Sequence, residues 1–234
     1  MQTYKQNDAE SAAAEAGEFL NQFLLENKDK PILLMLSAGS SFKLLDYIGK
    51  HVLGEHLTIS LLDDRFSQES DVNNFAALQK TDFYTDALNS DVNFIGTLPR
   101  QNETMESLAQ RWNESLELWI TNNPKGKIIT TFGMGADGHT AGIFPERDAK
   151  KFDALFKNNS LVTAYDATGK NQHPLRITTN FNFFKKINSA YVYVCGTDKK
   201  PKLDEVLNKQ GTINNLPALL WHELKEVKIF TDIQ

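Results

Sequence analysis

Short, continuous apolar runs recur along the chain and are its clearest structural signal. The runs at 31–36 and 57–62 are rich in leucine and isoleucine, and polar residues follow each of them. Runs of this length predict strands that are buried on both faces, as in a parallel sheet. Similar runs predict further strands at 92–95, 127–132, 161–165, 190–195 and 227–231.

Segments with helical spacing of apolar residues lie between these strands. In 8–26 the apolar positions form one stripe, and Asn7 or Asp8 is suited to cap the helix. Further helices are predicted at 42–48, 73–88, 103–121, 198–207 and 216–224. This alternation predicts an α/β fold with an open, mainly parallel sheet and helices on both faces. No linker, repeat or low-complexity tract divides the sequence, so we expect residues 1–234 to form a single domain.

Polar or glycine-containing segments follow four of the predicted strands. These segments are 37–41, 63–65, 133–139 and 196–199. Each alone is compatible with an ordinary turn. Because ligands bind beyond the carboxyl ends of strands in open α/β sheets, the four together predict a site at that edge.

The first segment, Ser-Ala-Gly-Ser-Ser, has the composition of an anion-binding loop. Ser37, Gly39 and Ser40 offer hydroxyl and backbone N–H groups at the start of a predicted helix. No Gly-Lys-Ser/Thr follows, so it is not a Walker A loop. A serine-rich helix cap is the alternative interpretation.

The third segment formally matches the dinucleotide fingerprint G-x-G-x-x-G. That interpretation requires a helix after the third glycine, and Pro145 limits any helix there. The alternative is a catalytic loop in which Asp137 orients the imidazole of His139, a natural general base. A histidine that merely caps the following turn is the plain structural alternative.

Three cations are candidate phosphate ligands. They are Arg65, which ends the second segment, Arg176, in what we interpret as an ordered turn, and Lys199. Lys199 falls in a first helical turn, where a cation opposes the helix dipole. A cation at that position indicates an anionic partner, although a solvated surface lysine is the commoner explanation.

Composition narrows the range of functions. The chain has 25 Lys+Arg against 30 Asp+Glu, a net charge of -5, which argues against a nucleic-acid or anionic-membrane binder. Cys195 is the only cysteine, so neither an intrachain disulfide nor a thiolate metal cage is expected. The polar N-terminus and the absence of a long apolar run predict a cytoplasmic protein.

Taken in order, the motifs resemble the 6-phosphogluconolactonase family. The resemblance is carried by 36–40, 63–65, 73–75 and 133–145 and extends over roughly residues 10 to 230. Its most specific part is the Gly-Ala-Asp-Gly-His-Thr-Ala-Gly-Ile-Phe-Pro segment. Relatives of this family include glucosamine-6-phosphate isomerase/deaminase, which shares the fold and the phosphate site.

The resemblance implies hydrolysis of 6-phospho-D-glucono-1,5-lactone to 6-phosphogluconate, in the oxidative pentose phosphate pathway. His139 would deprotonate water and Asp137 would hold its ring. Arg65 would stabilise developing negative charge near the sugar, and Asp63 would order its loop or meet the sugar hydroxyls. The phosphate would be held by Ser37, Gly39, Ser40, Arg176 and Lys199.

The same resemblance implies no metal, no organic cofactor and no partner beyond the sugar-phosphate substrate. We expect a monomer or a homodimer.

Two other functions remain open from the sequence. An amino-sugar-phosphate isomerase/deaminase would use Asp63 as its base, but that branch has a glutamate where Phe144 stands here. A non-catalytic sugar-phosphate sensor is suggested by departures from the family pattern. These are Ala38 for a glycine, Asp64 for a glutamate, and Asn-Asn-Phe at 73–75. Ala38 would be strained if its backbone needed a positive φ.

Overall fold

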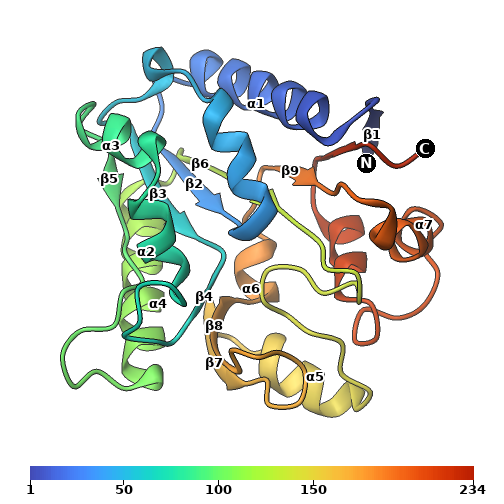
Figure 1. Cartoon of the computed structure of the whole chain (residues 1–234). Coiled ribbons are helices and arrows are strands. Elements are labelled where there is room, and N and C mark those ends of the chain that lie inside the picture. The colour runs from blue at the N-terminus through green and yellow to red at the C-terminus, as the bar shows by residue number, and fades with distance from the viewer.

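The computed structural model describes residues 1–234 and is built on a seven-stranded parallel sheet (Figure 1). The strand order is β1-β10-β9-β6-β2-β3-β5, and every neighbouring pair is parallel. The strands are β1 (Gln2–Lys5), β2 (Ile32–Leu36), β3 (Leu57–Leu61), β5 (Asn93–Phe94), β6 (Lys127–Phe132), β9 (Ser189–Tyr193) and β10 (Val227–Thr231). The predicted α/β fold with an open parallel sheet is confirmed.

A second, smaller sheet lies beside the first and is antiparallel, in the order β4-β8-β7. Its strands are β4 (Asp63–Arg65), β7 (Val162–Asp166) and β8 (Leu175–Thr179). The interpretation of the Arg176 segment as a turn is therefore wrong. Pairing with β4 and β7 holds this segment extended, and the polar sequence of β4 gave no sign of a strand.

Helical segments occupy every connection where one was predicted, although those at 42–48 and 216–224 are 3₁₀, and two helices at 149–156 and 181–184 were not predicted. The α-helices are α1 (Ala9–Glu26), α2 (Asn74–Gln79), α3 (Asp82–Leu88), α4 (Met105–Asn122), α5 (Ala149–Phe156), α6 (Phe181–Phe184) and α7 (Lys200–Leu207). Four 3₁₀ segments are η1 (Gly39–Tyr47), η2 (Lys50–Val52), η3 (Thr197–Lys199) and η4 (Pro217–Glu223). The helix predicted at 73–88 is two helices, because the Thr81 hydroxyl caps a new one by accepting the Tyr84 N–H.

Both faces of the main sheet are covered, which explains why its strands are continuously apolar. Along β2, Ile32, Leu34 and Leu36 pack in one core cluster with residues of α1 and η1. The alternate residues Leu33 and Met35 pack in the other cluster, with residues of α4, α6 and α7. All five side chains are fully buried. Residues two apart point to the same face of a strand, so this alternation follows from strand geometry.

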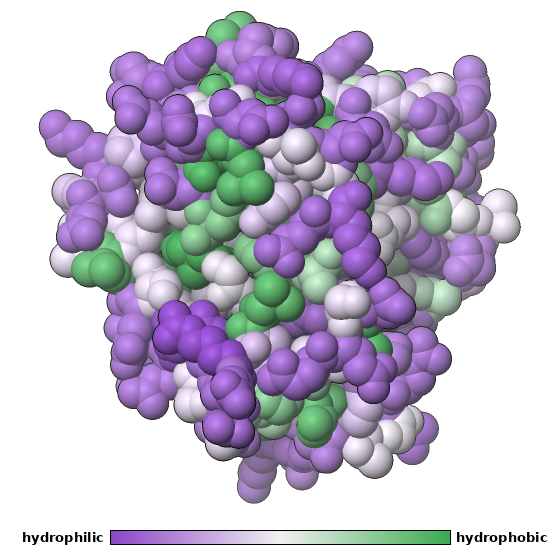
Figure 2. All heavy atoms as spheres, turned by 60° about the vertical axis from the view of Figure 1, so that its left-hand side comes forward, coloured by the Kyte–Doolittle hydropathy of each residue, from purple (hydrophilic) through white to green (hydrophobic).

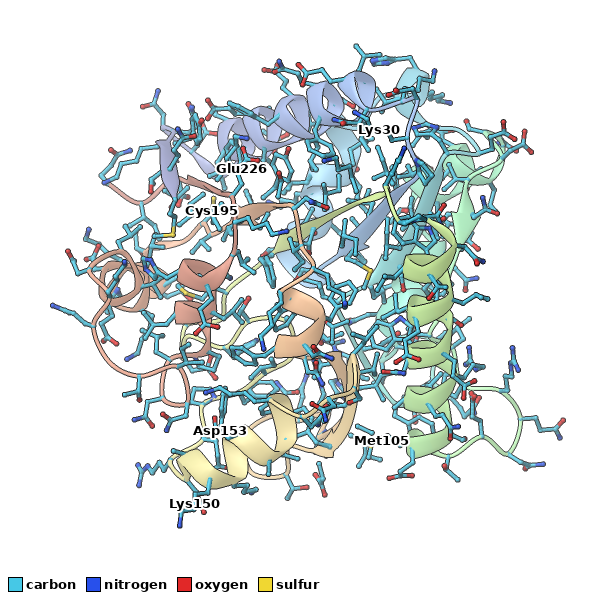
Figure 3. All side chains as sticks on the ribbon, turned by 180° about the vertical axis from the view of Figure 1, so that it is seen from behind. Lys30, Met105, Lys150, Asp153, Cys195 and Glu226 are labelled. Carbon is cyan, nitrogen blue, oxygen red and sulfur yellow. The ribbon has the colours of Figure 1, made fainter.

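Most of the atoms on the face of the molecule drawn in Figure 2 belong to hydrophilic residues. On the face shown in Figure 2, apolar atoms form separate groups among polar ones. No helix is both long and apolar enough to pass through a bilayer. Viewed from behind, α5 with Lys150 and Asp153 lies at one end of the molecule, and Lys30 lies at the other (Figure 3). Cys195, which follows β9, is a free thiol.

Candidate active site

The four polar segments predicted to form a site do converge on one cavity. They follow β3, β2, β6 and β9, which are consecutive neighbours in the sheet. The cavity measures about 220 Å³. It is lined by Ser37, Ala38, Gly39, Ser40, Asp63, Arg65, Asn74, Gly133, Met134, Gly135, His139, Thr140, Ala141, Gly142, Arg176 and Lys199. Every candidate residue lines it except Asp137, which contacts His139 beside it.

The loop after β2 presents backbone and hydroxyl groups to the cavity. Gly39 has φ of +72°, a left-handed conformation that glycine adopts without strain. Ala38 has φ of -84°, so the strain considered for alanine at this position does not arise. The Ser37 N–H is anchored on Oγ1 of Thr131, at 2.9 Å, which fixes where the loop leaves the sheet.

The loop after β6 holds a histidine–aspartate pair. Nδ1 of His139 lies 2.5 Å from Oδ1 of Asp137, and the His139 backbone N–H donates to the same oxygen at 3.1 Å. Partial burial raises the pKa of Asp137, but the hydrogen bonds and charge of His139 outweigh it and leave that pKa below its ordinary value. Asp137 is therefore a carboxylate that orients the ring.

The surroundings of His139 leave its ring little freedom. A Cβ on Gly135 would lie 2.2 Å from the imidazole, so only glycine lets the ring lie against the backbone there. On another side the ring packs on Phe144, with centroids 4.5 Å apart. No helix follows Gly138 until α5 begins at Ala149, so the loop lacks the helix that a dinucleotide site requires.

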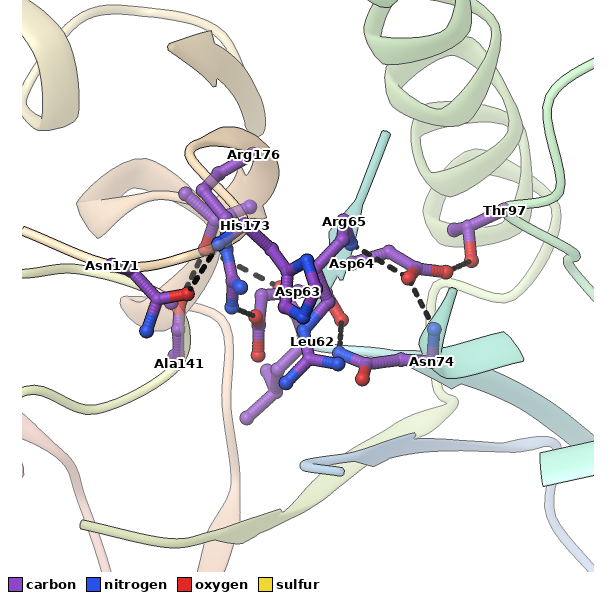
Figure 4. Close-up of polar contacts among 12 residues, drawn as sticks. Leu62, Asp63, Asp64, Arg65, Asn74, Thr97, Ala141, Asn171, His173 and Arg176 are labelled. Carbon is purple, nitrogen blue, oxygen red and sulfur yellow. Dashed lines mark hydrogen bonds and ion pairs between the residues drawn. The ribbon is translucent and has the colours of Figure 1, made fainter. Parts of the chain in front are cut away.

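Asp63 and Arg176 form an ion pair at the cavity wall, shown in Figure 4. Both side chains are almost completely buried, at 7% and 5% exposed. The Arg176 guanidinium also lies 5.6 Å from the Phe144 ring centroid, and its Nε has no partner. Arg176 lines the cavity as predicted, but it is a paired and packed residue rather than a free cation.

Arg65 and Lys199 have no carboxylate within ion-pair distance. Nη1 of Arg65 donates to the Val72 carbonyl at 3.0 Å, while its Nε is buried without a partner. Burial and the nearby charge of Arg176 lower the pKa of Arg65, although it stays protonated. Two unpaired cations lining one cavity favour an anionic ligand, even though the chain is acidic overall.

The sequence interpretation missed Asn74, Thr140 and Gly142 as cavity residues. Nδ2 of Asn74 donates to the Asp63 carbonyl at 3.1 Å, and Gly142, with φ of +64°, approaches the Asp63 side chain closely. These three residues belong to the Asn-Asn-Phe and His-Thr-Ala-Gly motifs, which the sequence analysis had singled out. A motif alone does not show which of its residues will face the cavity. Nowhere do three or more His, Cys, Asp and Glu side chains gather as metal ligands would.

Comparison with known proteins agrees with this architecture. The family model described as glucosamine-6-phosphate isomerases/6-phosphogluconolactonase matches residues 4–229. A 6-phosphogluconolactonase of Haemophilus influenzae is 29% identical over 194 residues, 80% of this chain and 77% of that protein. A probable 6-phosphogluconolactonase of Dictyostelium discoideum is 24% identical, over 81% of this chain and 73% of its own length.

Solved structures show the same fold. The 6-phosphogluconolactonase of Shewanella baltica superposes with a TM-score of 0.80 at 21% identity, covering 98% of this chain and 96% of that one. The Leishmania guyanensis protein gives 0.78 at 20% identity, with 98% and 95% covered. The family match spans nearly the whole sequence, including every strand end that lines the cavity. The chain belongs to the glucosamine-6-phosphate isomerase/6-phosphogluconolactonase family.

Proposed function

We propose that this protein hydrolyses 6-phospho-D-glucono-1,5-lactone to 6-phosphogluconate. The observation that carries the proposal is the His139–Asp137 pair, at 2.5 Å, beside a cavity whose unpaired cations are Arg65 and Lys199. A base next to an anion-binding wall is what hydrolysis of a phosphorylated lactone requires. Curated relatives from Haemophilus influenzae and Helicobacter pylori that match the chain are named 6-phosphogluconolactonase.

In the proposed reaction, the Asp137 carboxylate accepts a hydrogen bond from Nδ1–H of His139, which leaves the unprotonated Nε2 as the base. Nε2 takes a proton from water while the water oxygen adds to the lactone carbonyl carbon. The tetrahedral intermediate collapses, the bond from this carbon to the ring oxygen breaks, and the imidazolium returns the proton to the ring oxygen. One water is consumed and one carboxylic acid is formed.

The remaining cavity residues bind and stabilise charge in this proposal. Lys199 and the loop of Ser37, Gly39 and Ser40 hold the phosphate, with the charge of Arg176 contributing from the wall. Arg65 stabilises the oxyanion that develops on the carbonyl oxygen. Arg65 lines the cavity and has no carboxylate partner, so its charge is available for this purpose.

The isomerase/deaminase alternative is less consistent with the geometry. The position of that branch's glutamate is Phe144, a buried ring that packs on His139 and cannot transfer a proton. Asp63, the base of that reaction, is held by Arg176. The sensor alternative also loses support, since Ala38 is unstrained and Asn73 caps α2 by accepting the Ala76 N–H.

The direct test follows acid release from freshly generated 6-phosphogluconolactone against the spontaneous rate. We expect a clear excess rate and no ammonia release from glucosamine 6-phosphate. Ammonia release would favour the deaminase. Binding of 6-phosphogluconate without turnover would favour the sensor.

Replacing Lys199 with methionine tests the phosphate role. Loss of one charge-assisted contact of about 1.5–3 kcal/mol should raise KM for the phosphorylated lactone roughly 10- to 150-fold. Gluconolactone without phosphate should be hydrolysed almost unchanged. Lys200→Met is the matched control, because Lys200 contacts the Gln234 carbonyl and Asp204, outside the cavity. Equal losses on both substrates would contradict a phosphate role for Lys199.

A further inference from the structure

Asp64 is a completely buried carboxylate without a cationic partner. It is 0% exposed, and no Lys or Arg lies within ion-pair distance. Four donors meet it instead: the N–H groups of Arg65 (2.7 Å), Asn74 (2.6 Å) and Phe75 (3.1 Å), and the Thr97 hydroxyl (2.5 Å). Burying a charge is costly unless such donors surround it, so a carboxylate retained here needs an explanation.

The hydrogen bonds of Asp64 join three segments behind the cavity. They connect β4, the first turn of α2 and the segment around Thr97 (Figure 4). Asp64 does not line the cavity, but Arg65 and Asn74, whose backbones it holds, both do. The Asn74 side chain in turn donates to the Asp63 carbonyl at 3.1 Å, so the same hydrogen-bond network also holds Asp63, the residue before Asp64.

We propose that Asp64 is a positioning residue whose ionised carboxylate holds Arg65 and Asn74 against the substrate. This proposal rests on the proposed lactonase function. An ionised carboxylate only accepts hydrogen bonds, so it can satisfy all four donors at once. A protonated one places an O–H among these donors, so at least one of the four contacts must open or, at the Thr97 hydroxyl, reverse its direction.

The ionisation of Asp64 falls in a range that an activity measurement can reach. Burial raises the pKa of Asp64 to about 6, while the hydrogen bonds from Thr97, Asn74, Arg65 and Phe75 oppose the rise. The charged neighbours are Asp63 and Arg65 on β4 and Arg176 on β8. From α4, Arg111 donates to the Gly96 and Leu98 carbonyls on either side of Thr97 and pairs with Glu103. Helix α2 and residues 95–98 carry no charge. Acidification should therefore protonate Asp64 and weaken its hold on Arg65 and Asn74.

Thr97 allows this role to be tested without altering a cavity residue. Thr97→Val removes one of the four donors to the charged form, so the pKa of Asp64 should rise. We expect the acid limb of the kcat/KM profile to move upward by about 1 pH unit or more. Thr97→Ser keeps the hydroxyl and should restore the wild-type limb.

Thr58→Val is the matched control. Thr58 is also a buried threonine, and its hydroxyl accepts from Trp119 at 3.1 Å, away from the cavity. This variant should lower the Tm without moving the acid limb. Every other ionisable group is common to all these variants, so only a difference between their profiles reports on Asp64.

Asp64→Asn completes the test. Loss of the charge should misplace Arg65 and Asn74 and lower kcat/KM by about 10²-fold. Adding Thr97→Val to it should cause no further shift. An unmoved acid limb in Thr97→Val, with a Tm loss like that of Thr58→Val, would overturn the positioning role, even if Asp64→Asn fails to fold. A wild-type protein without lactonase activity would instead overturn the proposed function.

Discussion

Replacing His139 with glutamine is expected to lower kcat for lactone hydrolysis by about 10²–10⁴-fold, the usual contribution of a general base. Glutamine keeps a polar side chain against Asp137 but cannot take a proton from water. The loss should fall on kcat rather than KM, because the phosphate contacts remain. Asp137→Asn should cost less, since it removes the orienting charge but leaves the base in place.

The rate must be measured above spontaneous hydrolysis, because water alone attacks a lactone slowly. His51→Gln is the control, as His51 is exposed on η2 and lies outside the cavity. If His139→Gln kept most of the kcat, His139 would be structural and Asp63 would be the next candidate base. Asp63 would then have to act while paired with Arg176.

Replacing Arg176 with methionine is expected to destabilise the fold by about 3–5 kcal/mol, because it leaves the Asp63 carboxylate buried and unpaired. In a chain of this size the loss corresponds to a fall in Tm of roughly 6–20 °C. Thermal unfolding measured by circular dichroism tests this. Adding Asp63→Asn should recover part of the loss, since it removes the isolated charge.

The control for that experiment is an exposed ion pair. Lys157→Met breaks the contact with Asp153, at 2.8 Å, in which the two side chains are 42% and 55% exposed. It should cost less than about 1 kcal/mol. A Tm for Arg176→Met as close to wild type as that of Lys157→Met would show that the buried pair contributes little to stability. Arg176 would then be available to act mainly on the substrate.

The main sheet was predictable because burial on both faces leaves a continuous apolar run, as in Ile32–Leu36. Strands without that signature were missed. β1 pairs with a single neighbour at the edge of the sheet and needs no apolar run. β4 is three charged residues, held extended by its pairing with β8. Local sequence cannot predict such a pairing, because β4 and β8 are more than a hundred residues apart in the chain.

The site was predictable to the level of its loops. Parallel strands place their carboxyl ends on one edge, so polar residues after β2, β3, β6 and β9 had to meet. The partners of those residues were not predictable. In the sequence, Asp63, Asp64 and Arg65 are three adjacent charged residues, and nothing local distinguishes their surroundings. Folding makes Asp63 the partner of Arg176, buries Asp64 among uncharged donors, and leaves Arg65 facing the cavity.

The first and last strands of the chain are neighbours in the sheet, with Gln2 beside Lys228 and Lys5 beside Thr231. A ribosome therefore releases β1 long before its only partner exists, and this edge of the sheet stays incomplete until β10 has been made. Closing so long a loop is slow compared with forming local contacts. The cavity needs β9 and Lys199 as well, so a nascent chain has no complete site until Lys199 has been made.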